Sequence, residues 1–312
     1  MCHLRLRVFG VYTLNSQLKK QKYQSDKLGF LFEKSNILRD SGKNMHKCCD
    51  FITLAADING EVKPTQISFC RQKYCPTCSR RKSLRAYAIG MRLFEELEKD
   101  YAFLHMVLTI KNCCADQLRE TIRKLHSSSS KLLRGEICGV FKGCLRCLEI
   151  SYNQTSDEFH PHLHCLIAVN KSYFKSRYYV SQQALRDEWA NIVGQTFASV
   201  YITRIKDPEK AVAEVCKYCL KPIDIDDVGH ALAVYENLYM QTKNTRHTQS
   251  YGVIRDTLRK LKLDFEKDDE LSVLLDINEF DDLGEMIDGR TCAYAFDRQL
   301  QKYIPVDTWA KK

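Results

Sequence analysis

The stretch HPHLHCLIAV at residues 160–169 constrains the fold most, because three histidines alternate with other residues at the start of an apolar run. Side chains on a β-strand point alternately to its two faces, so His160, His162 and His164 share one face. Imidazole is a common metal ligand, and two imidazoles two residues apart on a strand can hold one ion. The alternative is a strand whose histidines hydrogen-bond locally in the core. His160 lies toward the preceding turn, so His162 and His164 are the favoured pair.

A second apolar stretch precedes the histidines and is expected to pair with them. Residues 143–152 indicate a strand, and the polar residues 153–157 that follow are typical of a turn. In a hairpin closed by that turn, Glu149 falls opposite His162 or His164 on the same face. Two imidazoles and one carboxylate with open coordination positions suit Mg²⁺ or Mn²⁺ better than structural zinc. A register slip of one residue would instead leave Glu149 as an exposed strand carboxylate.

The cysteines indicate a second metal site of a different kind. The chain has 15 of them, which cannot form a disulfide scaffold in a reducing compartment, so they are metal ligands or apolar fillers. A Cys-x2-Cys pair with an earlier cysteine five residues before it, and a further pair about twenty residues upstream, can wrap one tetrahedral Zn²⁺. Neighbouring lysines and arginines favour thiolates; the alternative is a core of free thiols. The expected zinc ligands are Cys49, Cys70, Cys75 and Cys78, with Cys48 or His46 as alternatives to Cys49.

A helix is expected from Ser79 onward, because apolar residues recur about one turn apart up to the polar run that ends at Asp100. Its first turns are basic. They could bind a phosphate backbone, or they could simply be solvated. The expected DNA-binding residues are Arg80, Arg81, Lys82 and Arg85.

The remaining pattern alternates strands and helices. We expect further strands at 103–112 and 198–206, and further helices at 115–133 and 181–193. The expected organisation is a region without an assigned role at 1–45, a cysteine segment with the basic helix at 46–100, a main domain at 101–262 and an acidic tail at 263–312.

One more helix is expected to carry chemistry. Asp207 as N-cap and Pro208 at the first position predict its start, and it must end before Pro222. On a helical wheel its apolar residues face one side. The other side presents a carboxylate, a phenol and two ammonium groups, from Glu214, Tyr218, Lys217 and Lys221. The two lysines would lower the pKa of the phenol and hold a phosphate, although a solvated surface helix would look similar.

Charge and hydropathy bound the class of protein. Residues 266–312 hold 12 acidic and 6 basic residues, a net −6; the whole chain carries +9, so residues 1–265 carry +15. A basic body suggests a polyanionic partner, most often nucleic acid. No apolar run approaches the roughly 20 residues of a membrane span, and the N-terminus lacks a signal-peptide core. We therefore expect a cytoplasmic protein without membrane contact.

Three motifs resemble those of plasmid rolling-circle replication initiators in the single-tyrosine HUH endonuclease superfamily. They occur in the family order: LTIKN at 108–112, HPHLH at 160–164 and EVCKYCLK at 214–221. The cysteine segment FCRQKYCPTCSRRKS resembles the segment before the first motif in the same subfamily. The first motif departs from the usual FLTLT-like form. The resemblance covers roughly residues 46–260, up to the stretch TRHTQSYGVIRD at 245–256.

The resemblance implies an α+β fold with a central antiparallel five-stranded sheet flanked by helices. It also implies sequence-specific nicking and joining of single-stranded or cruciform origin DNA. Tyr218 would keep the 5′ phosphate, and the 3′ hydroxyl would prime DNA synthesis. A host helicase and a host polymerase are the expected partners. Glu214 corresponds to the family's terminating glutamate. Because Cys219 stands where two-tyrosine relatives could carry a second nucleophile, one tyrosine is expected.

Two alternatives stay open. A transposase or conjugative relaxase would use the same chemistry, although single-tyrosine transposases are usually much shorter and lack the cysteine segment. A non-catalytic, zinc-dependent DNA-binding regulator would use the histidines structurally. The regulator differs from all of the enzymes in one observable way, because it would bind DNA without cutting it in any divalent metal.

Overall fold

The fold is taken from a computed structural model, which describes residues 15–56, 62–195, 199–216, 227–265 and 291–306. The chain divides into two compact units, one of residues 1–84 with 268–312 and one of residues 85–267. The long helix α3 (Pro76–Leu97) begins in the first unit and ends in the second.

The second unit is built on a five-stranded antiparallel sheet in the order β6-β3-β5-β4-β7. Its strands are β3 (Tyr101–Thr109), β4 (Phe141–Asn153), β5 (Glu158–Asn170), β6 (Ser199–Arg204) and β7 (Thr248–Gly252). The expected α+β class with a five-stranded antiparallel sheet is therefore confirmed. The sequence did not predict β7, because five half-buried residues give no apolar pattern.

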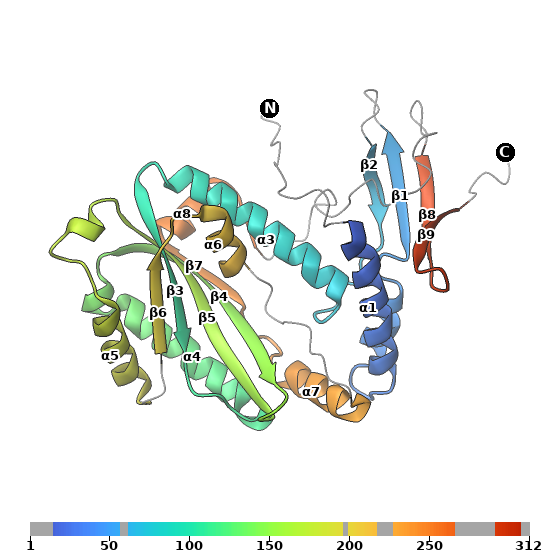
Figure 1. The fold of residues 1–312 in the computed structure, drawn as a ribbon, viewed down its shortest axis with the longest axis horizontal. Coiled ribbons are helices and arrows are strands. Elements are labelled where there is room, and N and C mark those ends of the chain that lie inside the picture. Colours follow the sequence, from blue (N-terminus) through green and yellow to red (C-terminus); the bar gives the residue numbers. More distant parts are fainter. Residues whose placement is uncertain (1–14, 57–61, 196–198, 217–226, 266–290, 307–312) are drawn as a thin grey trace. The chain divides into compact units, whose positions relative to one another are not determined.

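Helices cover both faces of this sheet (Figure 1). They are α4 (Leu118–Arg134), α5 (Gln182–Val193), α6 (Pro208–Val215) and α8 (Val253–Lys260). Helix α7 (Val228–Gln241) lies beyond the end of the sheet, and its last turn contacts α4 through Arg119. Leu145 and Leu166 pack with α3, α6 and α8 in one core. Arg146, whose side chain points to the other face, bonds to the backbone of α4. The sheet thus has an α6/α8 face and an α4 face.

Local chemistry explains where the predicted helices begin. In α6 the Asp207 carboxylate accepts the Lys210 N–H at 3.1 Å and Pro208 occupies the first turn. In α5 the Ser181 hydroxyl accepts from Ala184 N, and Gly194 ends the helix with a φ of 66°. These starts agree with the sequence prediction. Residues 217–221, where the α6 prediction continued, lie outside the described residues.

The first unit has its own four-stranded sheet in the order β2-β1-β8-β9. The strands are β1 (Phe51–Ala56), β2 (Val62–Ile67), β8 (Thr291–Asp297) and β9 (Lys302–Val306), and two helices, α1 (Asn15–Glu33) and α2 (Arg39–His46), precede them. The region expected to be an acidic tail thus supplies two strands, with Tyr294 beside Ile52 in β1. Pairing between residues over 200 positions apart leaves no local sequence signal.

No helix among the described residues is both long and apolar enough to cross a bilayer.

Candidate functional site

The β4–β5 hairpin brings the predicted carboxylate and histidines together. The Asn153 side chain accepts the N–H of Thr155 at 2.9 Å, which closes the turn where the sequence predicted it. The register then pairs Glu149 directly with His162. Residues opposite each other on antiparallel strands share a face. Glu149, His162 and His164 therefore lie on the α6/α8 face, and all are buried.

The ligand-type atoms of these three residues converge. Glu149 Oε2 lies 3.1 Å from His162 Nε2 and 2.9 Å from His164 Nε2, and the three atoms all lie within 4.8 Å of one another. His162 Nδ1 lies 3.2 Å from the His160 carbonyl oxygen, so Nδ1 donates and Nε2 of the neutral ring carries a lone pair. A carboxylate oxygen and imidazole lone pairs directed at one point require a cation or protons between them. This donor set fits a hard divalent ion with open positions.

Two further polar residues support the histidines. His105 Nε2 on β3 lies 3.2 Å from His164 Nδ1, and the two rings stack with an interplanar angle of 9°. Asn112 Oδ1 lies 2.6 Å from His160 Nδ1. Such outer contacts fix the tautomer and orientation of ligand imidazoles. The sequence alone did not point to His105. Its contact with His164 exists only because β3, which carries His105, pairs with β5.

Helix α6 packs on the same face of the sheet. Its residues Val212, Val215 and Cys216 are buried in the core with Leu145 and Leu166, as the helical wheel predicted. The helix approaches α3 closely at Gly90, where an added Cβ would lie 2.5 Å from Val212 Cγ1. Glu214 is half-buried on α6. Tyr218, Lys217 and Lys221, predicted to share its chemical side, lie outside the described residues.

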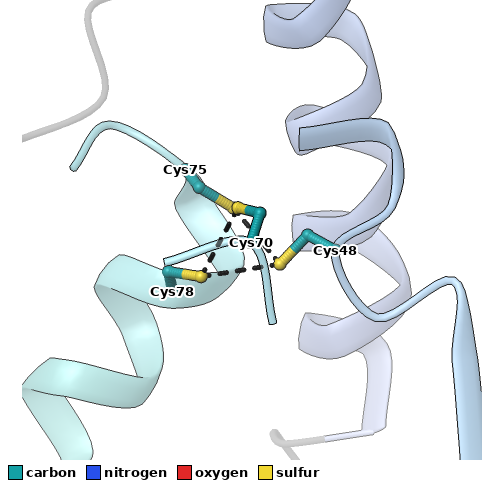
Figure 2. A group of neighbouring side chains, drawn as sticks. All are labelled: Cys48, Cys70, Cys75 and Cys78. Carbon is teal, nitrogen blue, oxygen red and sulfur yellow. Dashed lines mark hydrogen bonds between the residues drawn. The ribbon is translucent and has the colours of Figure 1, made fainter. Parts of the chain in front are cut away.

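The predicted cysteine site forms a compact cluster of thiols between the end of α2 and the start of α3 (Figure 2). The Sγ atoms of Cys48, Cys70, Cys75 and Cys78 all lie within 4.8 Å of one another. Three of the separations are 3.5, 3.5 and 3.7 Å, close to the roughly 3.8 Å edge of a tetrahedron with Zn–S bonds of about 2.3 Å. Hydrogen bonds from Cys48, Cys70 and Cys78 hold the pKa of the Cys75 thiol well below its ordinary value, whereas hydrogen bonding among the neighbouring thiols and burial raise the pKa of the other three thiols. The cluster without an ion therefore places its negative charge on Cys75, and a bound cation would favour the thiolate form of the others.

The fourth thiol is Cys48, whereas the sequence assignment named Cys49. Cys49 has a left-handed backbone with φ of 50°, and its carbonyl oxygen accepts a 2.7 Å hydrogen bond from Tyr303 Oη. It is not among the four clustered thiols. The His46 ring nitrogens lie 3.3 Å from Asp26 and 3.4 Å from Glu33, so this alternative ligand pairs with carboxylates instead. Two adjacent cysteines cannot be ranked by spacing alone, because backbone conformation decides which one points inward.

We expect Cys48→Ser to lose bound zinc and Cys49→Ser to keep it. The first change removes one of four tetrahedral ligands, and a structural zinc site contributes directly to folding. Zinc content by inductively coupled plasma mass spectrometry, together with thermal denaturation, would measure both variants. Equal zinc content in the two variants would contradict the Cys48 assignment.

The four basic residues of the α3 start differ in exposure. Arg81 is buried, and its guanidinium lies 4.2 Å from the centre of the Phe69 ring, so its side chain is not placed to contact a phosphate. Burial lowers the pKa of Arg80. Lys82 and Arg85 are half-buried, and one Arg85 nitrogen donates to the Asp264 carbonyl at 3.1 Å. The structure thus gives this segment a partly structural role.

The sequence of this chain is similar to those of known replication proteins. A family model described as "Replication protein" matches residues 61–304. A Staphylococcus aureus protein named "Protein rep" is 34% identical over 218 residues, covering 67% of this chain and 95% of that protein. A Streptococcus pneumoniae "Protein rep" is 26% identical over 301 residues, covering 91% and 90%. No solved structure matches the chain. The chain therefore belongs to the replication protein family, which confirms the relationship to plasmid rolling-circle replication initiators that its motifs predicted.

Proposed function

We propose that this protein nicks and rejoins one DNA strand at a plasmid origin through a 5′-phosphotyrosine intermediate, and so initiates rolling-circle replication. The observation that carries the proposal is the buried Glu149–His162–His164 group on the same sheet face as α6. The three relevant motifs lie within the part of the chain that the replication protein model matches. A membership of this kind favours origin DNA as the partner, with a host helicase and polymerase acting afterwards.

Glu149, His162 and His164 would hold Mg²⁺ or Mn²⁺, which supplies Lewis acidity at a phosphate oxygen when bound. The Tyr218 oxygen would attack the scissile phosphorus and lose its proton to a base, for which Glu214 is the candidate. The bond from phosphorus to the 3′ oxygen breaks, and that oxygen takes up a proton from water to leave as the 3′ hydroxyl. Lys217 and Lys221 hold the phosphate and lower the pKa of the phenol. Rejoining is the reverse reaction, in which a 3′ hydroxyl attacks the phosphotyrosine.

Glu214 is assigned the role of acid–base residue. It lies four residues before Tyr218 in the sequence, and it would take a proton from the nucleophile during cleavage or activate water to release the protein from DNA. The Cys48, Cys70, Cys75 and Cys78 site would hold a structural Zn²⁺ that orders the start of α3. Lys82 and Arg85 remain candidates for phosphate contacts of this segment.

A cleavage assay on the parent replicon tests the proposal. With Mg²⁺ or Mn²⁺, the purified protein should cut a single-stranded origin oligonucleotide at one position. The 3′ end should be extended by a polymerase, and the 5′ end should be blocked by protein. Removal of divalent ions with a chelator should stop cleavage. DNA binding without cleavage in any divalent metal would favour the non-catalytic regulator.

A further inference from the structure

A basic pocket of about 670 Å³ lies away from the Glu149–His162–His164 group, on the other face of the sheet. It is lined by α4, by the chain between α7 and β7, and by Arg146 on β4. Arg146 and Glu149 are three positions apart on one strand, so their side chains point to opposite faces. The chain leading into β7 forms one wall, and β7 is an edge strand. The pocket therefore opens at the β7 edge, on the α4 face.

The pocket is strongly and uniformly charged. Five basic side chains line it, and no aspartate or glutamate does so among the residues that the structure describes. Arg119 and Arg123 are four residues apart, so they lie on one side of α4. Lys243 and Arg246 face them from the opposite wall, and both are exposed. A concave surface with one sign of charge concentrates the opposite charge.

Arg146 shows that the pocket is constructed rather than incidental. Its side chain is only 4% exposed, and the hydrogen bonds it donates go to neutral oxygens. Acceptors include the His126 carbonyl at 3.2 Å, Ser130 Oγ at 3.1 Å, Gln249 Oε1 at 3.0 Å and Ser129 Oγ. A buried charge is costly unless a counter-charge is nearby. An anion in the pocket would supply that counter-charge.

Two neighbouring residues, Arg119 and His126, help to fix the geometry of the pocket. Arg119 donates to the carbonyl oxygens of Met240 and Lys243, which holds the end of α7 against α4. Burial, together with the nearby Arg146, lowers the pKa of His126 to about 4, so this imidazole is neutral at physiological pH. The pocket thus combines a buried arginine held in place by hydrogen bonds with long, exposed cationic side chains at its rim. Such groups are suited to contact phosphates.

We propose that this pocket binds backbone phosphates of the origin DNA away from the scissile bond. The proposal rests on the proposed function, which makes origin DNA the ligand. A strand that reaches both sites must pass around the β7 edge, because the two sites face opposite sides of the sheet. Contacts to phosphate position a duplex or strand without reading its sequence. The pocket therefore supplies affinity and register, while the Glu149 face supplies the chemistry.

The test compares two double variants that each remove one arginine and one lysine. Arg123→Gln/Lys243→Gln alters the pocket, whereas Lys175→Gln/Arg177→Gln alters two exposed residues that do not line it. Binding of a labelled origin oligonucleotide and of a scrambled oligonucleotide of equal length would be followed by fluorescence anisotropy over a salt series. Divalent ions are left out, so the measurement does not depend on cleavage. Thermal denaturation confirms that both variants are folded.

We expect the pocket variant to bind both oligonucleotides about tenfold more weakly, and its salt slope to fall by about 1.4, since each single-strand phosphate contact contributes about 0.7. The control variant should stay within about twofold of wild type, because its charges make no such contact. Equal behaviour of the two variants would overturn the proposal. Stabilisation of wild type by inorganic phosphate, with unchanged DNA binding in the pocket variant, would also overturn it and assign the pocket to a small anion.

Failure of the proposed function is distinguishable from failure of this inference. A wild-type protein that binds DNA but never cuts it refutes the nicking proposal and leaves the pocket result intact. A wild-type protein that cuts DNA, with a pocket variant that binds as the control does, refutes the pocket alone.

Discussion

Tyr218→Phe is expected to reduce strand cleavage by on the order of 10⁴-fold or more and to eliminate covalent attachment to DNA. Phenylalanine keeps the ring and removes the oxygen that attacks phosphorus, and loss of a covalent nucleophile is among the largest single-residue effects in enzymes. Cleavage is measured on a labelled origin oligonucleotide with Mn²⁺, and attachment by the mobility of denatured protein–DNA adducts. DNA binding should be retained, because the phenol oxygen is used in the reaction and not in docking.

Tyr201→Phe is the matched control for this experiment. Tyr201 on β6 is paired with Val107 of β3 and so shares the sheet face of His105 and of the Glu149–His162–His164 group. Its side chain is 54% exposed, so it is an accessible tyrosine on the same sheet face. Normal cleavage is expected in Tyr201→Phe. Loss of cleavage in this variant, with activity kept in Tyr218→Phe, would move the nucleophile to β6.

Glu149→Gln is expected to reduce cleavage by on the order of 10³-fold at a fixed Mn²⁺ concentration. The change preserves the shape of the side chain and removes the negative charge that lies 2.9–3.1 Å from the two histidine nitrogens. Divalent affinity should fall, so higher Mn²⁺ should restore part of the rate. His162→Ala, which removes an expected metal ligand, should abolish cleavage. Both rates are measured over a Mn²⁺ titration with the same oligonucleotide.

Zinc content separates the two metal groups in the same variants. Glu149→Gln and His162→Ala should keep the zinc of wild type, because the thiol cluster is formed by other residues. Cys48→Ser should lose it. Equal zinc loss in Glu149→Gln and Cys48→Ser would show that the chain has one metal site, and that the division into a catalytic and a structural metal is wrong.

The hairpin of the site was predictable from sequence for a physical reason. A turn-prone segment at residues 153–157 between two apolar strands predicts the hairpin and leaves His162 or His164 opposite Glu149. The observed register pairs Glu149 with His162. His105 was not predictable, because its contact with His164 requires knowing that β3 lies beside β5. The α6 start was predictable from its cap residues, which act within one turn.

Other parts of the structure depend on contacts that no local pattern records. The choice of Cys48 over Cys49 follows from a backbone conformation held in place by Tyr303, a residue about 250 positions away. Arg81 looks like a surface cation in sequence, yet the adjacent Phe69 ring covers it. The basic pocket likewise assembles from α4, β4 and the chain before β7. Each case depends on a contact made in the folded chain, which residue spacing does not record.

The central claim is that Tyr218 forms the covalent link to DNA, and peptide mapping tests it most directly. Wild-type protein is allowed to cut an origin oligonucleotide with Mn²⁺, the adduct is digested with protease and nuclease, and the modified peptide is sequenced by mass spectrometry. A nucleotide joined through its 5′ phosphate to Tyr218 is the predicted result. Attachment to any other residue, or complete cleavage with no attached nucleotide, would contradict the account.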